Sequence, residues 1–267
     1  MSLPSEQTAQ AWSGLQSKRV GIPTVLEKII QPKVDGLSPI SFYLRLPPGA
    51  KDGTKLSGVI AYCTWVSDRK SLMQQLLYDT DRPEDQLRIP AVQMLKYASE
   101  NNLAVLTWST PGKWSAAKSS DELARKELKK VDDMFDDYAV MWEKGVAEFV
   151  KDTGIPESDY LLYGFSRGAQ WAHRLALRKP ERFWAINIHV NSSYDIPTAI
   201  GSECLWLVTT GDLEHGYAGG KRFYAQSMAL GYPMIFKAQE KLGHSSCMEV
   251  ETLRDLFFDL PGKNQRT

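Results

Sequence analysis

A series of short apolar segments, separated by stretches with helical spacing, is the feature that most restricts the fold of this 267-residue chain. Residues 58–63 and 103–108 are continuous apolar runs of the kind that a strand buried on both faces requires. Short buried strands that alternate with helices predict the α/β class, with a mostly parallel sheet covered by helices on both faces. The other predicted strands cover residues 40–46, 160–163, 184–189, 205–209 and 234–239, and the predicted helices cover 86–100, 120–152, 168–178, 219–230 and 247–259.

The chain divides into a polar N-terminal segment and one domain. Residues 1–35 contain Pro4, Pro23 and Pro32 and predict an irregular arm or covering segment, whereas residues 36–267 predict a single domain. The N-terminal segment has no apolar signal core, which predicts a cytoplasmic protein, or a secreted one if a signal peptide preceded Met1.

Charge and hydropathy exclude several classes of protein. The 32 basic and 32 acidic residues give a formal charge of zero, so the chain lacks the basic excess that binding to nucleic acid requires. No apolar stretch approaches the roughly 18 residues of a membrane span. The three cysteines, Cys63, Cys204 and Cys247, are predicted to be ordinary, mostly buried thiols, with a bridge between Cys204 and Cys247 as the alternative.

The sequence Gly164-Phe165-Ser166-Arg167-Gly168 lies between a predicted strand and a predicted helix. A sharp strand-to-helix turn presents a serine hydroxyl above the edge of a sheet, so Ser166 is the candidate nucleophile. Gly164 and Gly168 are needed there because a side chain would collide with the backbones of the neighbouring strand and helix. The helix that begins after Ser166 stabilises negative charge near its first turn.

A serine nucleophile needs a base, and the chain contains four histidines. His173 is seven residues along the same helix, about 10 Å from Ser166, and cannot reach the hydroxyl. It is predicted to be a helix-surface or packing residue. His189 ends a strand and borders the site, while His215 follows the acidic loop and predicts a capping or lining role. His244 lies in a loop between the last strand and the last helix, where a base can reach the serine, so it is the candidate base.

The third member must orient the base, and two carboxylates compete for that role in Gly211-Asp212-Leu213-Glu214. Both follow an apolar strand, and in an extended loop both can point toward His244. Glu214 is preferred and Asp212 is the second candidate.

Two backbone amides must bind the oxyanion of an acyl-transfer reaction. Arg167, directly after the nucleophile, supplies one, and the turn after residues 58–63 supplies the other. Trp65 is the candidate there, with Thr64 as the alternative. Trp65, Trp108 and Trp114 follow strand ends on one side of the sheet, where they either wall an acyl pocket or belong to the aromatic core.

From about residue 40 to 260 the sequence resembles the α/β-hydrolase superfamily, through residues 164–168, residues 211–214 and Gly243-His244. The chain order Ser166, Glu214, His244 is the order of that superfamily. More narrowly, Gly-Phe-Ser-Arg-Gly-Ala-Gln and Gly-Asp-Leu-Glu resemble polyhydroxybutyrate depolymerase and feruloyl esterase relatives. The resemblance implies an α/β-hydrolase fold, ester cleavage through a serine acyl-enzyme and no cofactor. The usual acid of those relatives is aspartate at the position of Glu214, which keeps Asp212 in contention.

These residues together predict a serine hydrolase that cleaves a carboxylic ester of a small molecule or polymer, with no cofactor and no metal. The alternatives are a serine peptidase of the same fold and a non-catalytic binding protein on a hydrolase scaffold. No zinc-protease motif or dinucleotide fingerprint competes with this interpretation. The oligomeric state and the groups on either side of the ester are not predicted.

Overall fold

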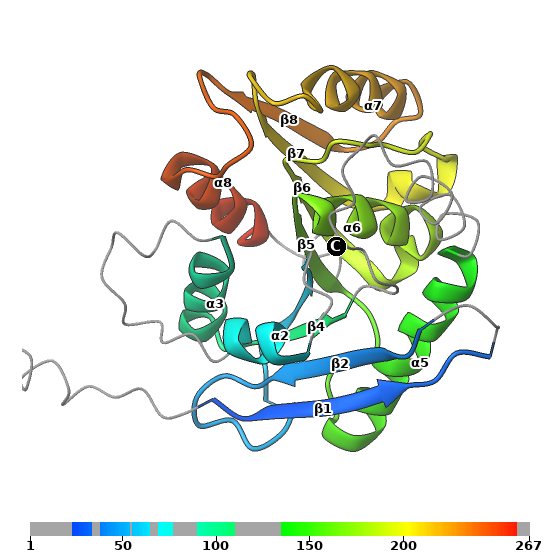
Figure 1. Cartoon of the computed structure of the whole chain (residues 1–267), viewed down its shortest axis with the longest axis vertical. Helices are drawn as coiled ribbons and strands as arrows, with labels where there is room; N and C mark the ends of the chain where they lie inside the picture. The colour runs from blue at the N-terminus through cyan, green and yellow to red at the C-terminus, as the bar shows by residue number, and fades with distance from the viewer. Residues whose placement is uncertain are drawn as a thin grey trace, which may run out of the picture.

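The structure, a computed structural model, describes residues 23–33, 38–53, 55–64, 69–76, 90–109 and 135–260. Its strands are β1 (Val25–Ile30), β2 (Ile40–Arg45), β3 (Gly58–Cys63), β4 (Leu103–Trp108), β5 (Tyr160–Phe165), β6 (Phe183–His189), β7 (Leu205–Gly211) and β8 (Met234–Gln239). They form one eight-stranded sheet in the order β1-β2-β4-β3-β5-β6-β7-β8 (Figure 1). The pairs β1–β2 and β2–β4 are antiparallel, and all other neighbouring pairs are parallel, so the mostly parallel sheet is confirmed.

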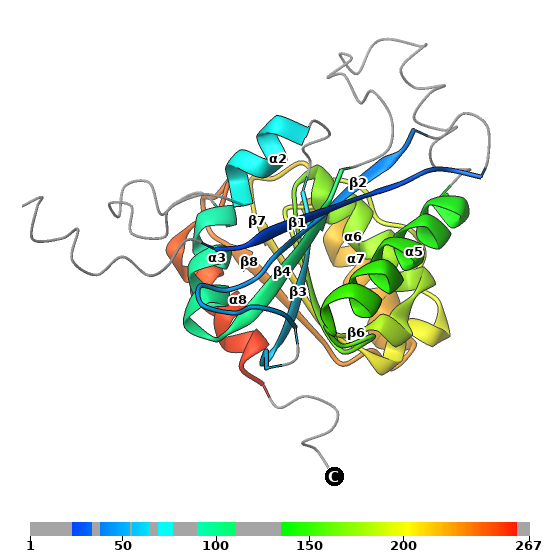
Figure 2. The same ribbon diagram turned by 90° about the horizontal axis from the view of Figure 1, so that it is seen from below.

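Helices cover both faces of this sheet, as Figure 2 shows. One face carries α5 (Phe135–Thr153), α6 (Arg167–Arg178) and α7 (Tyr217–Ala229). The other carries α2 (Arg69–Leu76), α3 (Pro90–Glu100) and α8 (Met248–Phe258). Two short 3-10 helices, Pro180–Arg182 and Ala199–Glu203, precede β6 and β7. The sheet therefore separates two hydrophobic cores.

The central strands supply side chains to both cores because successive residues of a strand point to opposite faces. In β4, Leu106 belongs to the core beneath α5 and α6, whereas Val105 belongs to the core beneath α3. Both residues are fully buried, as are Ala61 and Ile60, which pair with them in β3. This arrangement explains why the central strands are continuous apolar runs.

Most of the predicted elements agree with the structure. The predictions for β3, β4 and β8 match in both bounds, and the other predicted strands are found with small differences at their ends. Of the helix predicted over residues 120–152, the part from 135 onward is α5, and residues 120–134 lie outside the described residues. All three cysteines are free, so the alternative of a Cys204–Cys247 bridge is wrong.

The N-terminal segment holds an element that the sequence did not predict. Residues 25–30, predicted as irregular, form the edge strand β1, and residues 1–22 lie outside the described residues. β1 pairs with a single neighbour and remains partly exposed, so it lacks the apolar run of a central strand. Lys28 on β1 forms an ion pair with Asp152 of α5. Helix α2 was also not predicted.

His173 of α6 is fully buried, which corrects the helix-surface alternative and favours packing. Its Nε2 accepts a hydrogen bond of 2.9 Å from the backbone N–H of Asp195, and its Nδ1 lies 3.3 Å from the carbonyl oxygen of Ala169. The neutral ring with hydrogen on Nδ1 satisfies both contacts. Burial lowers the pKa of His173 to about 4, although the Asp195 carboxylate, 3.9 Å from Nε2, opposes the shift.

Because the ring of His173 is buried in its neutral form, we expect the folded protein to lose stability in mild acid. Between a pH of about 6.5 and about 4 the unfolded chain binds a proton at residue 173 that the folded protein excludes, so the free energy of unfolding falls as the pH falls. The loss at the lower limit is on the order of 3 kcal/mol. Urea unfolding over this pH range should show a smaller decrease for His173→Gln than for the wild type. Equal pH dependence of the two proteins would contradict the prediction.

Candidate active site

Ser166 occupies the turn between β5 and α6, at the carboxyl end of a central strand. Its φ of 57° and ψ of −121° lie in a region that residues with a side chain rarely adopt. The backbone N–H of Ser166 donates a 3.0 Å hydrogen bond to the carbonyl oxygen of His189 on the neighbouring strand β6. The predicted strand-turn-helix context is therefore confirmed, and the turn holds the serine in a strained backbone conformation.

The two glycines around Ser166 are required by close backbone contacts. A β-carbon on Gly164 would lie 2.6 Å from the carbonyl oxygen of Gly168 and 2.8 Å from Cα of Ala169. A β-carbon on Gly168 would lie 1.9 Å from the carbonyl oxygen of Cys63, at the end of β3. The prediction that side chains would collide here is confirmed. The contact at Gly168 also brings the first turn of α6 against the end of β3.

His244 reaches Ser166 from the loop between β8 and α8. Its Nε2 lies 2.7 Å from Oγ of Ser166, which is hydrogen-bond distance. Its Nδ1 lies 3.0 Å from Oε2 of Glu214. The structure thus brings together three residues that the sequence singled out, although they are far apart along the chain.

Glu214 and Asp212 differ in their surroundings. The side chain of Glu214 is only 1% exposed and contacts His244, whereas Asp212 is exposed to solvent. Residues 211–214 form a turn closed by a 3.2 Å hydrogen bond from the backbone N–H of Glu214 to the carbonyl oxygen of Gly211, so the two carboxylates are not aligned as they would be in an extended loop. Glu214 is therefore the carboxylate that meets the histidine.

The loops that carry Glu214 and His244 are joined by backbone contacts. The N–H of Leu213 donates to the carbonyl oxygen of Leu242 at 3.1 Å. A β-carbon on Gly211 would lie only 1.9 Å from that same carbonyl oxygen. Glycine at position 211 therefore allows the two loops to approach closely enough for the side chains of Glu214 and His244 to meet.

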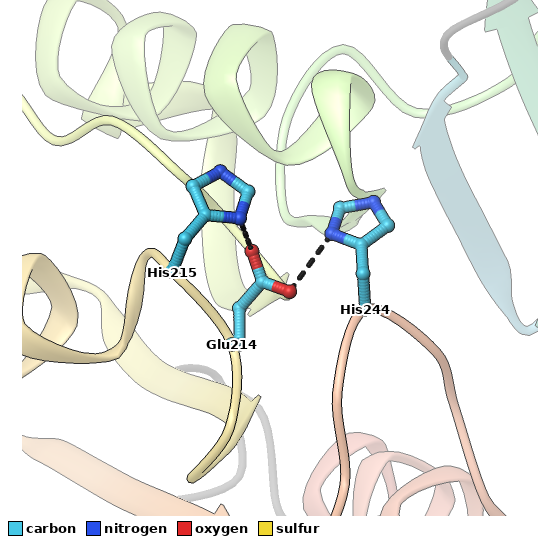
Figure 3. Close-up of side chains that lie close together, drawn as sticks. All are labelled: Glu214, His215 and His244. Atoms are coloured by element: carbon cyan, nitrogen blue, oxygen red, sulfur yellow. Dashed lines mark hydrogen bonds and ion pairs between the residues drawn. The ribbon is translucent and has the colours of Figure 1, made fainter.

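His215 makes a second contact with the same carboxylate. Its Nδ1 lies 2.5 Å from Oε1 of Glu214, so the carboxylate stands between two imidazole rings, as Figure 3 shows. The rings of His215 and His244 lie nearly parallel, with centroids 6.0 Å apart. The predicted position of His215 next to the acidic loop is confirmed. Glu214, His215 and His244 are also the group among the described residues that could hold a metal ion.

His189 borders the site from within the core. It is fully buried, its Nδ1 lies 2.9 Å from Oγ1 of Thr209, and its ring lies 5.3 Å from that of Phe165. Burial lowers the pKa of His189 to about 3, so the ring is neutral at neutral pH. His189 forms part of the floor beneath the serine turn.

A buried charged network supports the His244 loop, and the sequence did not predict it. Oγ of Ser246 donates to Glu251 on α8, and Glu251 forms a buried ion pair with Arg254. The guanidinium carbon of Arg254 lies 5.0 Å from the ring centre of Tyr163 on β5. The sequence signal for this pair is that Glu251 and Arg254 are three residues apart and Phe258 follows four residues later. This spacing puts the two charges on the same face of the helix as an apolar residue. Burial raises the pKa of Glu251, and Arg254 opposes the shift.

The candidate oxyanion residues are only partly described. Arg167 is the first residue of α6, and Thr64 directly follows β3, next to the close contact at Gly168. Trp65 and Trp114 lie outside the described residues. Trp108 is fully buried and packs edge-on against Trp142, with ring centroids 5.7 Å apart, so it belongs to the aromatic core and does not wall a pocket.

Comparison with known proteins supports the fold. The sequence matches no protein-family model and no curated protein. Fungal esterases from Rhizomucor miehei align with a TM-score of 0.57 at 10% identity, covering 96% of this chain and 90% of theirs. An S-formylglutathione hydrolase from Agrobacterium tumefaciens aligns with a TM-score of 0.57 at 15% identity, covering 90% and 94%.

A third similar structure comes from a larger protein. A protein of Bacteroides ovatus assigned as a dipeptidyl aminopeptidase IV aligns with a TM-score of 0.62 at 13% identity, covering 91% of this chain but 36% of its own. Identities this low establish the fold alone. No helix among the described residues is long and apolar enough to cross a membrane. The chain has the α/β-hydrolase fold, as its sequence predicted.

The ion pair of Glu251 and Arg254 behind the His244 loop allows a prediction of how the loss of one buried charge changes the stability of the protein. Arg254→Met leaves Glu251 buried without its counter-ion and should lower the free energy of unfolding by about 3–5 kcal/mol. The double variant Glu251→Gln/Arg254→Met should be clearly more stable than the single variant, because no unpaired charge remains at residue 251. Urea unfolding at pH 7 measures both, and a double variant no more stable than Arg254→Met would contradict this explanation.

Proposed function

We propose that the protein is a serine hydrolase that cleaves a carboxylic ester through an acyl-enzyme on Ser166. The observation that carries the proposal is the continuous chain of contacts from Ser166 Oγ to His244 Nε2, and from His244 Nδ1 to Glu214 Oε2. A serine, a histidine and a carboxylate in this geometry form the arrangement that activates a hydroxyl for acyl transfer.

In the proposed first step Oγ of Ser166 attacks the ester carbonyl carbon, and Nε2 of His244 takes the hydroxyl proton. Glu214 accepts a hydrogen bond from Nδ1–H, which fixes this tautomer and stabilises the imidazolium. The imidazolium then gives its proton to the departing alkoxide oxygen. The alcohol leaves, and the acyl group remains bonded to Ser166.

Negative charge develops on the carbonyl oxygen during the attack. We assign its stabilisation to the backbone N–H of Arg167, together with that of Trp65 or of Thr64, the residue that directly follows β3. The contact between Gly168 and the carbonyl oxygen of Cys63 supports this assignment, because it holds the two backbone segments side by side. The N-terminus of α6 adds a favourable dipole at the same position.

In the proposed second step water hydrolyses the acyl-enzyme. His244 Nε2 removes a proton from the water as it attacks the acyl carbon, and the same proton then returns to Oγ of Ser166 as the carboxylic acid leaves. The exposure of the His244 side chain, 46%, is consistent with access of water from the solvent side. No cofactor is needed for either step.

The activities of the similar structures favour an ester or thioester over other bonds. They include the Rhizomucor esterases, a ferulic acid esterase and an S-formylglutathione hydrolase. The Bacteroides protein favours the second candidate, a peptidase that uses the same three residues on an amide bond. p-Nitrophenyl esters of increasing acyl length, compared with dipeptidyl p-nitroanilides, separate these two activities.

Substitution of the nucleophile and the acid tests the mechanism. Ser166→Ala should lower kcat on p-nitrophenyl acetate by at least about 10³-fold because it removes the nucleophile, and Glu214→Gln by about 10³- to 10⁴-fold because it removes the charge that orients His244 and stabilises its imidazolium. Asp212→Asn is the matched control in the same loop and should keep kcat within about twofold.

A fluorophosphonate probe provides a test that needs no substrate. Folded wild-type protein should become labelled at Ser166, whereas Ser166→Ala should not, with circular dichroism to show that both are folded. A wild-type protein that is folded and unlabelled would support the non-catalytic binding alternative, and full esterase activity in Ser166→Ala would rule out the mechanism.

A further inference from the structure

We propose that Glu214, His215 and His244 form a binding site for Zn²⁺, and that an ion bound there reversibly inhibits the enzyme. Binding depends only on these three side chains, whereas inhibition also rests on the proposed function. The three residues come from two loops at the same edge of the sheet, after β7 and after β8. Figure 3 shows Glu214 between the two imidazole rings.

The ligand atoms lie near enough to one another to take up the spacing of a tetrahedral zinc site. One carboxylate oxygen of Glu214 and one ring nitrogen from each histidine all lie within 4.8 Å of one another. Ligands that each bind Zn²⁺ at about 2.0–2.2 Å in tetrahedral geometry stand about 3.3 Å apart. Nδ1 of His215 lies 2.5 Å from Oε1 of Glu214 and Nδ1 of His244 lies 3.0 Å from Oε2, so the side chains must rotate about one ion to bring the ligand atoms to this spacing.

The buried carboxylate provides an independent reason to expect a cation. Oε1 of Glu214 is buried and accepts no well-directed hydrogen bond from any residue that the structure describes, although Nδ1 of His215 lies only 2.5 Å away. A buried carboxylate oxygen without a proper donor is unfavourable. An ion between Oε1 and the two nitrogens would satisfy it.

The chemistry and exposure of the ligands favour Zn²⁺ over Ca²⁺ or Mg²⁺. Imidazole nitrogen is a preferred ligand of zinc, whereas calcium and magnesium prefer sites made entirely of oxygen. The side chain of His215 is 69% exposed and that of His244 is 46% exposed, so an ion can enter from solvent. Solvent exposure also leaves room for a water molecule as the fourth ligand.

Bound zinc would remove the base from the reaction. Coordination uses the lone pair of Nδ1 of His244, so the proton that Nδ1 carried moves to Nε2, where it faces Oγ of Ser166. A ring with hydrogen on Nε2 cannot accept the serine proton. The same ion occupies Glu214, so the histidine also loses the carboxylate that orients it. Chelation of the ion by EDTA returns the proton to Nδ1 and restores the starting arrangement.

Calorimetric titration of the whole protein with zinc chloride tests binding without any activity measurement. We expect one ion per chain, with affinity reduced at least about tenfold in His215→Ala. Asp212→Asn changes an exposed carboxylate three residues before His215 and should keep the wild-type affinity for zinc. No binding to the wild type, or equal binding to His215→Ala, would overturn the site.

A second measurement tests the inhibition. Zinc chloride should block p-nitrophenyl ester hydrolysis and fluorophosphonate labelling of the wild type, and EDTA should restore both, whereas magnesium chloride should have no effect. The activity of His215→Ala, expressed relative to its own zinc-free rate, should resist zinc at least about tenfold better than that of the wild type. Zinc that binds by calorimetry and leaves an active wild type uninhibited would overturn the inhibitory role. A zinc-free wild type without hydrolysis or labelling would overturn the proposed function, while the calorimetry would still decide the site.

Discussion

Two backbone carbonyl oxygens lie where a β-carbon would otherwise stand, and the geometry around Ser166 depends on both. The carbonyl of Cys63 occupies the space beside Gly168, and the carbonyl of Leu242 occupies the space beside Gly211. The first contact joins the serine turn to the end of β3, and the second joins the two loops that carry Glu214 and His244. The alignment of the three side chains therefore follows from backbone packing at one edge of a parallel sheet, more than from the freedom of the side chains themselves.

Beneath this edge the protein buries two carboxylates next to basic side chains. Glu251 is paired with Arg254, and Glu214 lies between two histidines. A buried carboxylate is unfavourable unless it is paired or hydrogen-bonded, so these partners are part of the stability of the site. The carboxylate that orients His244 in the proposed reaction is thus the same one that would anchor an inhibitory ion. A single buried group links the proposed chemistry to its proposed inhibition.

Sequence patterns predicted the elements whose conformation depends on their own residues and burial. A central parallel strand is buried on both faces, so its sequence is a continuous apolar run, and β3 and β4 were predicted with their observed bounds. The glycines around Ser166 also follow a local rule, the strand-to-helix turn. The edge strand β1 was missed because Glu27 and Lys28 interrupt its apolar residues and because it lies within an otherwise polar segment that contains prolines. The pair of Glu251 and Arg254 was missed because charges on a helix normally face solvent.

The sequence by itself determined the α/β-hydrolase fold, the turn at Ser166 and the selection of His244 among four histidines, because these depend on periodicity, chain order and local turn geometry. Only the tertiary structure decided that Glu214, and not Asp212, meets His244, that His173 is buried and that His215 shares the same carboxylate. Two acids two residues apart in a loop are equivalent in a linear pattern. They become different when the close approach of the loops at Gly211 turns one carboxylate inward and leaves the other in water.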